Sequence, residues 1–127
     1  TQHLQCRDLL IDALLGFHLK GAPKGAYARL IEQANDSHVP ILAVDVPSGL
    51  NADTGKPFHP TIKASATVTL ALPKKGFLTD DAKSYLGRLF ITDIGILPEV
   101  YAKLNMSVPE KFKTGKIIEL LPEKKTL

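Results

Sequence analysis

Two aspartates, each placed directly after a short apolar run, are the residues best suited to chemistry. Asp12 follows Leu9–Ile11, and Asp45 follows Ile41–Val44. Short continuous runs of apolar and β-branched residues are typical of strands buried on both faces. A strand, a crossover helix and a second strand need about 30 residues or more, and the two acids are 33 positions apart. The spacing therefore predicts that both acids end neighbouring parallel strands and face one ligand crevice.

A hydroxyl near the second acid adds another oxygen donor. Ser48 lies in the stretch Pro47–Gly55, which holds too many turn-forming residues to be a strand or a long helix. Asp12, Asp45 and Ser48 are hard oxygen donors that could hold a cation together with backbone carbonyls. Alternatively, one carboxylate could be a general acid or base, which needs partial burial to raise its pKa. A lone aspartate would more simply cap a turn, but two at matching strand ends favour a functional site.

The segment after Asp12 predicts a loop that contacts a ligand. The loop consists of Gly16, Phe17, His18, Leu19, Lys20, Gly21 and Ala22. Its two glycines are spaced as in a phosphate-binding loop, but Ala22 and Pro23 stand where that motif requires Lys and then Ser or Thr. We therefore reject a Walker A site, and its absence counts against a phosphoryl-transfer enzyme, which stays a second alternative.

Two other kinds of site are also disfavoured. His18 and His59 lie in separate loops and do not form a metal signature, so we expect both to be solvated. Ser48 lacks the Gly-x-Ser-x-Gly elbow and a paired base, which argues against esterase activity.

The remaining apolar pattern predicts an α/β fold. We expect strands at residues 8–11, 39–44, 67–72 and 88–94, and short helices at 80–86 and 98–104. A longer helix opens near Pro23 and packs on the sheet through residues at helical spacing, namely Tyr27, Leu30, Ile31 and Ala34. Four strands with two or three helices make an incomplete doubly wound sheet that leaves an edge strand open.

A cationic turn follows the third predicted strand. Pro73-Lys74-Lys75-Gly76 would lie on the same rim as the two acids, where lysines suit a phosphate. An exposed lysine pair is nevertheless more often a solvated turn.

Composition excludes several classes of protein. The 127 residues suit one domain or part of one, with 44% hydrophobic and 23% charged residues. Residues 110–127 carry five lysines against three glutamates, so +2 of the net charge of +3 lies in this segment. The chain has no basic patch with interleaved aromatic residues, which argues against nucleic-acid binding. Cys6 is alone, which excludes an intramolecular disulfide and fits a reducing compartment. Because no apolar run approaches the roughly 18 residues of a membrane span and no signal peptide is visible, we expect a soluble cytoplasmic protein.

These motifs together resemble one known family. They are Asp12-Ala13-Leu14-Leu15-Gly16, Gly21, the run Val44-Asp45-Val46-Pro47-Ser48-Gly49-Leu50-Asn51-Ala52-Asp53-Thr54-Gly55, the turn at residues 73–76 and Asp93-Ile94-Gly95-Ile96. The resemblance is to the C-terminal half of the NAD(P)H-hydrate epimerase domain, also called the YjeF N-terminal domain. It implies a Rossmann-like three-layer αβα fold with a mainly parallel sheet, present here as an incomplete domain.

The resemblance also implies an activity and a site. Members of the family interconvert the R and S epimers of hydrated NADH or NADPH, a damaged nicotinamide nucleotide. Carried over by motif, Asp12 and Ser48 are potassium ligands, the loop from Gly16 to Ala22 contacts the substrate, and Asp45 contacts its reacting end. We expect Asp45 to be the acid-base group, because a carboxylate bound to a cation is a poor proton carrier. His18 stands where many members have a small residue, and the asparagine- and glycine-rich phosphate loop of the family is not in this chain.

The resemblance divides the chain into two parts. Residues 1–106 correspond to the C-terminal half of the epimerase domain, and residues 107–127 form a linker or tail. This tail resembles the linker into the ADP- or ATP-dependent hydrate dehydratase domain of bifunctional repair enzymes. A start without Met suggests that the chain opens inside a larger polypeptide.

The resemblance also implies the partners of the protein and leaves an alternative function open. We expect a small-molecule substrate, no nucleic acid, no membrane and a homo-oligomer. The main alternative is a catalytically inactive nucleotide-binding or protein-interaction module of the same fold.

Overall fold

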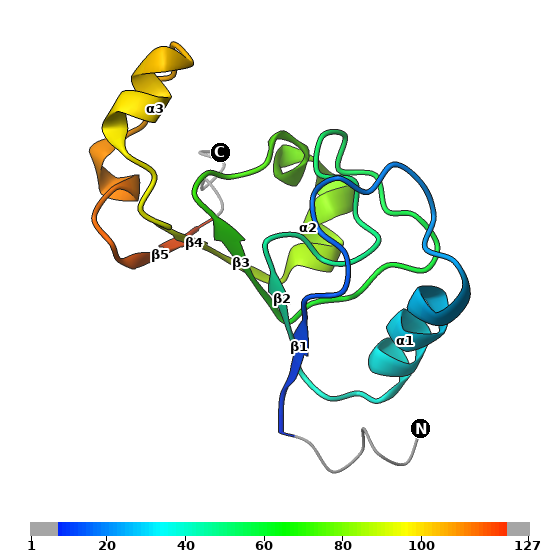
Figure 1. The fold of residues 1–127 in the computed structure, drawn as a ribbon. Helices are drawn as coiled ribbons and strands as arrows, with labels where there is room; N and C mark the ends of the chain where they lie inside the picture. Colours follow the sequence, from blue (N-terminus) through cyan, green and yellow to red (C-terminus); the bar gives the residue numbers. More distant parts are fainter. Residues whose placement is uncertain (1–7, 122–127) are drawn as a thin grey trace, which may run out of the picture.

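The computed structural model describes residues 8–121, which are built around a five-stranded sheet (Figure 1). Its strands lie side by side in chain order: β1 (Leu10–Asp12), β2 (Ile41–Val44), β3 (Ala66–Leu70), β4 (Arg88–Thr92) and β5 (Ile117–Leu120). The first four are parallel, and β5 is antiparallel to β4. The helices are α1 (Gly25–Asp36), α2 (Asp80–Leu86) and α3 (Pro98–Lys103), with 3-10 turns η1 (Lys75–Leu78) and η2 (Glu110–Phe112). The α/β class and the mainly parallel sheet are thus confirmed.

Helices α1 and α2 cover the same face of the sheet. Ile31 of α1 is fully buried against Ile41 and Ala43 of β2, and α2 packs on Leu89 of β4. Ala43 pairs with Thr67 of β3, which in turn pairs with Leu89, so these side chains point to one side. Both helices accordingly lie to the right of the strands in Figure 1.

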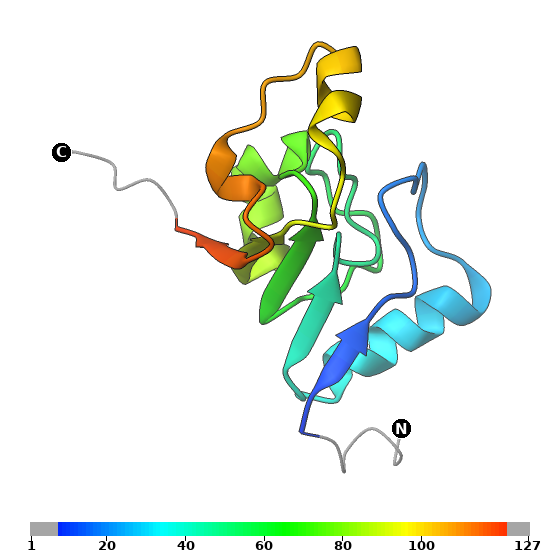
Figure 2. The same ribbon diagram turned by 60° about the vertical axis from the view of Figure 1, so that its left-hand side comes forward.

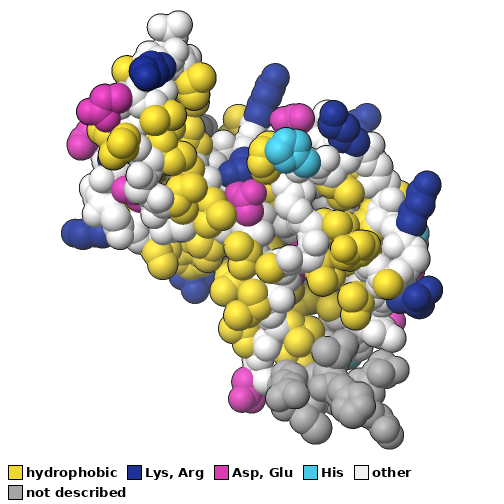
Figure 3. Space-filling view, viewed as in Figure 1, with side chains coloured by type: hydrophobic (Ala, Val, Ile, Leu, Met, Phe, Trp, Pro, Cys, Tyr) yellow, Lys and Arg dark blue, Asp and Glu magenta, His cyan; other side chains and the backbone are white. Residues whose placement is uncertain are grey.

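The opposite face of the sheet has no helical cover among the described residues. Figure 2 brings this face forward and shows β1 to β3 with no helix in front of them. Ile11 on this face is 66% exposed, and Leu42, Val68 and Phe90 are only half-buried. The space-filling view, taken from the direction of Figure 1, shows hydrophobic side chains over the strands and further ones towards the right of the molecule (Figure 3). Residues 8–121 therefore supply two of the three expected layers.

The predicted packing of Tyr27 was wrong. Ile31 is buried as expected, but Tyr27 is 50% exposed and Leu30 44% exposed. The reason is topological, because α1 crosses between β1 and β2, and β1 is the sheet edge in the described chain. Because residues 8–121 place no further strand beyond β1, half of the apolar stripe of α1 has no partner among them.

The end of the chain also differs from the linker expected there. Ile117–Leu120 forms β5 and pairs with Thr92–Leu89, beyond the boundary that we drew at residue 106. This apolar run is short and flanked by lysines, so its partner strand is invisible to local sequence pattern. Residues 1–7, including Cys6, and residues 122–127 lie outside the described part of the chain.

The two short helices were predicted well. The first, α2, has the expected bounds, and α3 ends one residue early. The Thr79 hydroxyl caps α2 by accepting a hydrogen bond from the Ala82 N–H at 3.3 Å. Within residues 8–121, none of the helices has the length and apolar character needed to cross a bilayer.

Candidate functional site

The carboxyl ends of β1, β2 and β3 form the edge on which the candidate residues meet. Asp12 is the last residue of β1 and pairs with Ala43 in β2, while Asp45 directly follows β2. The two acids therefore lie at the same edge, on adjacent parallel strands, as their spacing predicted. Their side chains bond to different neighbours, however. Asp12 connects the loops that follow β1 and β2, and Asp45 connects the end of β2 to β3.

Asp12 and Ser48 are bonded directly to each other. The Ser48 N–H donates to Asp12 Oδ2 at 2.7 Å, and the Ser48 hydroxyl donates to Asp12 Oδ1 at 2.6 Å. Ser48 Oγ also accepts from the Leu15 N–H at 2.9 Å and lies 3.3 Å from the Leu15 carbonyl oxygen. Both side chains are buried, with 4% and 1% exposure. This cluster fixes the start of the loop after β1, which contains Gly16–Ala22, against the loop after β2.

The loop after β2 is held in place by its own backbone. The Ser48 carbonyl accepts from the Ile62 N–H at 2.8 Å, and the Gly49 carbonyl accepts from the Phe58 N–H at 2.8 Å. Gly49 has a φ of 100°, and a Cβ placed there would lie 2.7 Å from the Cα of Thr61. Only glycine fits this close approach, so the glycine next to Ser48 is a structural requirement.

Asp45 lies in a strained turn that ends β2. Its φ is 69°, and the Val46 N–H bonds back to the Val44 carbonyl at 2.9 Å across it. This hydrogen bond over a single residue with positive φ is a γ-turn, a form that is rare for residues other than glycine. Ala71, just after β3, has a φ of 64° and the same bond, from the Leu72 N–H to the Leu70 carbonyl at 2.8 Å. Backbone strain of this kind costs about 1–3 kcal/mol per residue and clusters at functional sites.

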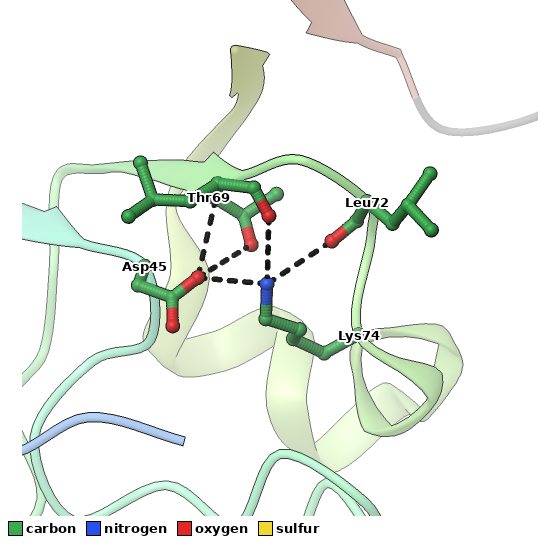
Figure 4. Close-up of polar contacts among 5 residues, drawn as sticks. Asp45, Thr69, Leu72 and Lys74 are labelled. Carbon is green, nitrogen blue, oxygen red and sulfur yellow. Dashed lines mark hydrogen bonds and ion pairs between the residues drawn. The ribbon is translucent and has the colours of Figure 1, made fainter. Parts of the chain in front are cut away.

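One oxygen of the Asp45 carboxylate is fully engaged (Figure 4). Asp45 Oδ1 lies 2.7 Å from Lys74 Nζ and accepts from the Leu70 N–H at 3.2 Å and the Thr69 hydroxyl at 3.4 Å. The described residues offer no hydrogen bond to the other oxygen, Oδ2. No buried side-chain oxygen in this part of the chain lacks a partner, so Oδ2 is reached by solvent. The carboxylate is therefore fixed on one side and open to a ligand on the other.

The two acids differ in their electrostatic surroundings. The side chain of Asp45 is 16% exposed, and the Lys74 ammonium offsets its charge, so Asp45 is also a carboxylate paired with a cation. The contrast expected between the two acids therefore rests on the open Oδ2 of Asp45 and not on the absence of a cation beside it. Asp12 is almost completely buried, and within residues 8–121 its partners are neutral N–H and O–H groups rather than a cation. Burying a carboxylate without a counter-charge costs desolvation free energy. A cation bound at Asp12 would offset this cost.

The donors around Asp12 fit a hard monovalent cation. Asp12 Oδ1 and the Leu15 carbonyl oxygen both lie within 3.3 Å of Ser48 Oγ, so carboxylate, hydroxyl and carbonyl oxygens converge there. They bring one negative charge, which a single positive charge neutralises. The described residues contain no group of three or more His, Cys, Asp or Glu that could hold a metal ion, so a cation here would depend on the hydroxyl and carbonyl oxygens as well as on Asp12.

The loop after β1 is exposed beside this cluster. Residues Leu15–Leu19 line an open hollow of about 380 Å³. Phe17 is 52% exposed, and its ring contacts the His18 ring in a tilted arrangement, with the centroids 3.9 Å apart and the planes at 40°. His18 and His59 are both exposed, as expected. A Cβ at Gly16 or Gly21 would meet no atom within 4 Å, so the described chain leaves space around both glycines.

Sequence reasoning missed the partners of Asp45. It assigned Lys74 only to a cationic turn suited to phosphate, and it gave Thr69 no role. One signal was available, because both residues flank the end of the strand next to Asp45. The inward direction of the lysine depends on the turn at Ala71, which local sequence does not reveal.

Fold and site together define an α/β protein whose candidate site lies at the carboxyl edge of a mainly parallel sheet, where ligands bind in open α/β sheets. The family described as YjeF-related protein N-terminus matches residues 1–76. This chain belongs to that family.

Named relatives agree with the family. The chain is 44% identical over 90 residues to an NAD(P)H-hydrate epimerase of Limosilactobacillus fermentum, a match that covers 71% of this chain and 43% of the relative. It is 47% identical over 95 residues to a bifunctional NAD(P)H-hydrate repair enzyme of Moorella thermoacetica, covering 75% of this chain and 18% of the relative. The chain thus spans less than half the length of these curated relatives.

A solved structure shares the fold. The crystal structure of yeast ynu0 superposes with a TM-score of 0.68 at 23% identity, covering 89% of this chain and 46% of the yeast chain.

Proposed function

We propose that the protein containing this chain interconverts the R and S epimers of hydrated NADH or NADPH, with Asp45 as its acid-base group. The names of the relatives support the substrate, since both kinds act on NAD(P)H hydrate. The observation that carries the chemistry is the state of Asp45: a strained turn fixes its backbone, a lysine holds Oδ1, and Oδ2 is open.

The proposed role of Asp45 is proton transfer at the hydrated carbon. As an acid, the carboxyl gives its proton to the departing hydroxyl, which leaves as water. As a base, the carboxylate takes a proton back when water adds to the other face. The overall step restores the enzyme and inverts one centre, and ring opening and closure would need the same two transfers. Such help is typically worth about 10² to 10⁴ in rate.

We propose that Asp12 and Ser48 hold a potassium ion. When bound, potassium would supply the positive charge that the buried Asp12 carboxylate lacks among the described residues. Through the Leu15 N–H, Ser48 connects this cluster to the ligand loop, so the cluster would set the position of Gly16–Ala22 against the substrate.

The direct test uses the complete protein and one separated epimer of hydrated NADPH. Chromatography should show that either epimer is converted to the same equilibrium mixture, faster than in the absence of protein. If the protein binds the nucleotide but does not equilibrate the epimers, the alternative of an inactive binding module is correct.

A further inference from the structure

The Lys74 ammonium is held at a single point by three oxygen atoms (Figure 4). It lies 2.7 Å from Asp45 Oδ1 and donates to the carbonyl oxygens of Leu70 at 3.0 Å and Leu72 at 3.1 Å. An ammonium group has three protons, so each has an acceptor. The side chain is 19% exposed, which leaves Lys74 little freedom to turn towards a phosphate.

The backbone after β3 creates this arrangement. The γ-turn at Ala71 brings the Leu70 and Leu72 carbonyls around one nitrogen, although a positive φ is unfavourable for alanine. Both carbonyl oxygens therefore accept hydrogen bonds from the Lys74 ammonium, which in turn pairs with Asp45. The strained turn at Ala71 thus fixes the position of the ammonium group.

We propose that Lys74 is the positioning residue of Asp45, an inference that rests on the proposed function. Lys74 holds Oδ1 at the sheet edge, and the carboxylate consequently presents Oδ2 to the substrate. Three acceptors around one nitrogen match an ammonium group and do not match the flat fork of a guanidinium group. Positive charge alone is therefore insufficient at this position.

The test is a double-mutant cycle in the complete protein, measured on epimer interconversion. Lys74→Met removes the charge and keeps the length of the side chain, and it should lower kcat at least tenfold with KM within about threefold. The double variant Lys74→Met/Asp45→Asn should be no slower than Asp45→Asn alone, because the lysine acts through Asp45. Lys74→Arg should remain closer to Lys74→Met than to wild type.

A matched control removes a lysine elsewhere. Lys103, exposed on α3, has no described contact with the site, and Lys103→Met should leave kcat and KM unchanged. A rise in KM with normal kcat for Lys74→Met would mean that Lys74 binds substrate directly, and losses that multiply in the double variant would mean that it acts independently. Either result overturns the positioning role.

Thermal unfolding of the four proteins of the cycle separates this inference from the proposed function. They are wild type, Lys74→Met, Asp45→Asn and the double variant. The shifts in unfolding midpoint should be non-additive, because the two side chains touch. Additive shifts would reject the contact itself. Non-additive shifts together with normal turnover in Asp45→Asn would instead reject the catalytic role of Asp45, while the ion pair would stand.

Discussion

At the scale of single residues, neighbouring aspartates acquire different properties from their partners. Asp12 is buried with both oxygens bonded to neutral groups of the same chain. Asp45 shares its charge with Lys74 and keeps one oxygen open. The proposed metal cation would bind the first carboxylate, and the proposed proton transfer would use the open oxygen of the second.

Replacing Ser48 tests the cation cluster. Ser48→Ala leaves Asp12 Oδ1 without its hydroxyl donor and the Leu15 N–H without its acceptor, so we expect a loss of about 1–3 kcal/mol in unfolding free energy. In the complete protein, the rate of epimer interconversion by the variant should also depend less steeply on the potassium concentration. Ser84→Ala, exposed on α2, is the control and should change neither quantity. An unchanged potassium dependence in Ser48→Ala would mean that the ligands are wrongly assigned.

Replacing Gly49 tests the close approach beside Ser48. Gly49→Ala combines a φ of 100° with a Cβ 2.7 Å from the Cα of Thr61, so denaturant unfolding should show a loss of about 2 kcal/mol or more. Gly16→Ala makes the same change in open space and should alter stability by less than about 1 kcal/mol. Equal effects of the two changes would contradict this packing.

At the scale of elements, β5 is attached to β4 by an ion pair as well as by backbone bonds. Arg88 donates from Nε and Nη2 to the two carboxylate oxygens of Glu119 at 2.8 and 2.9 Å. The hydrogen bonds from Arg88 lower the pKa of Glu119, and the same bonds raise the pKa of Arg88. The pair therefore favours β5 only while Glu119 is ionised.

This pair makes a pH-dependent contribution to stability. Because the folded pKa of Glu119 is lowered, its contribution is present above the ordinary pKa of glutamate and is lost as pH falls through the folded value. Glu119→Gln should thus unfold at slightly lower denaturant than wild type at pH 7, and the difference should vanish in acid below the folded pKa. A difference that persists unchanged in acid would show that the charge is not responsible.

The elements also show what a sequence can predict. Apolar runs closed by an acid identified β1 and β2, and the spacing of 33 residues placed their ends together, because this information is local and periodic. The exposure of Tyr27, the role of Ile117–Leu120 as a strand and the inward direction of Lys74 were missed. Each depends on which strand lies alongside or on one unusual backbone angle, and neither is encoded in a short window.

At the scale of the whole molecule, the sheet is covered on one side only within residues 8–121. Edge strand β1 and the face that carries Ile11, Leu42, Val68 and Phe90 present apolar surface to solvent. Surfaces of this kind promote association.

The 127-residue chain should therefore self-associate through this face. Sedimentation should show an average mass that rises with concentration, and Ile11→Lys should shift it towards the monomer by placing a charge on the open face. Leu78→Lys provides the control, since Leu78 is 80% exposed on η1, away from this face. A wild-type chain that stays monomeric, or an equal response to both changes, would contradict the prediction.

Proton transfer by Asp45 can be measured with the variant Asp45→Asn in the complete protein. Asparagine keeps the size of the side chain but cannot exchange the proton. We predict that kcat for interconversion of the epimers falls by about 10² to 10⁴ while KM changes little. Asp36→Asn, exposed at the end of α1, should retain wild-type kcat. Near-normal turnover in Asp45→Asn would contradict the claim and leave Asp45 with a role in binding alone.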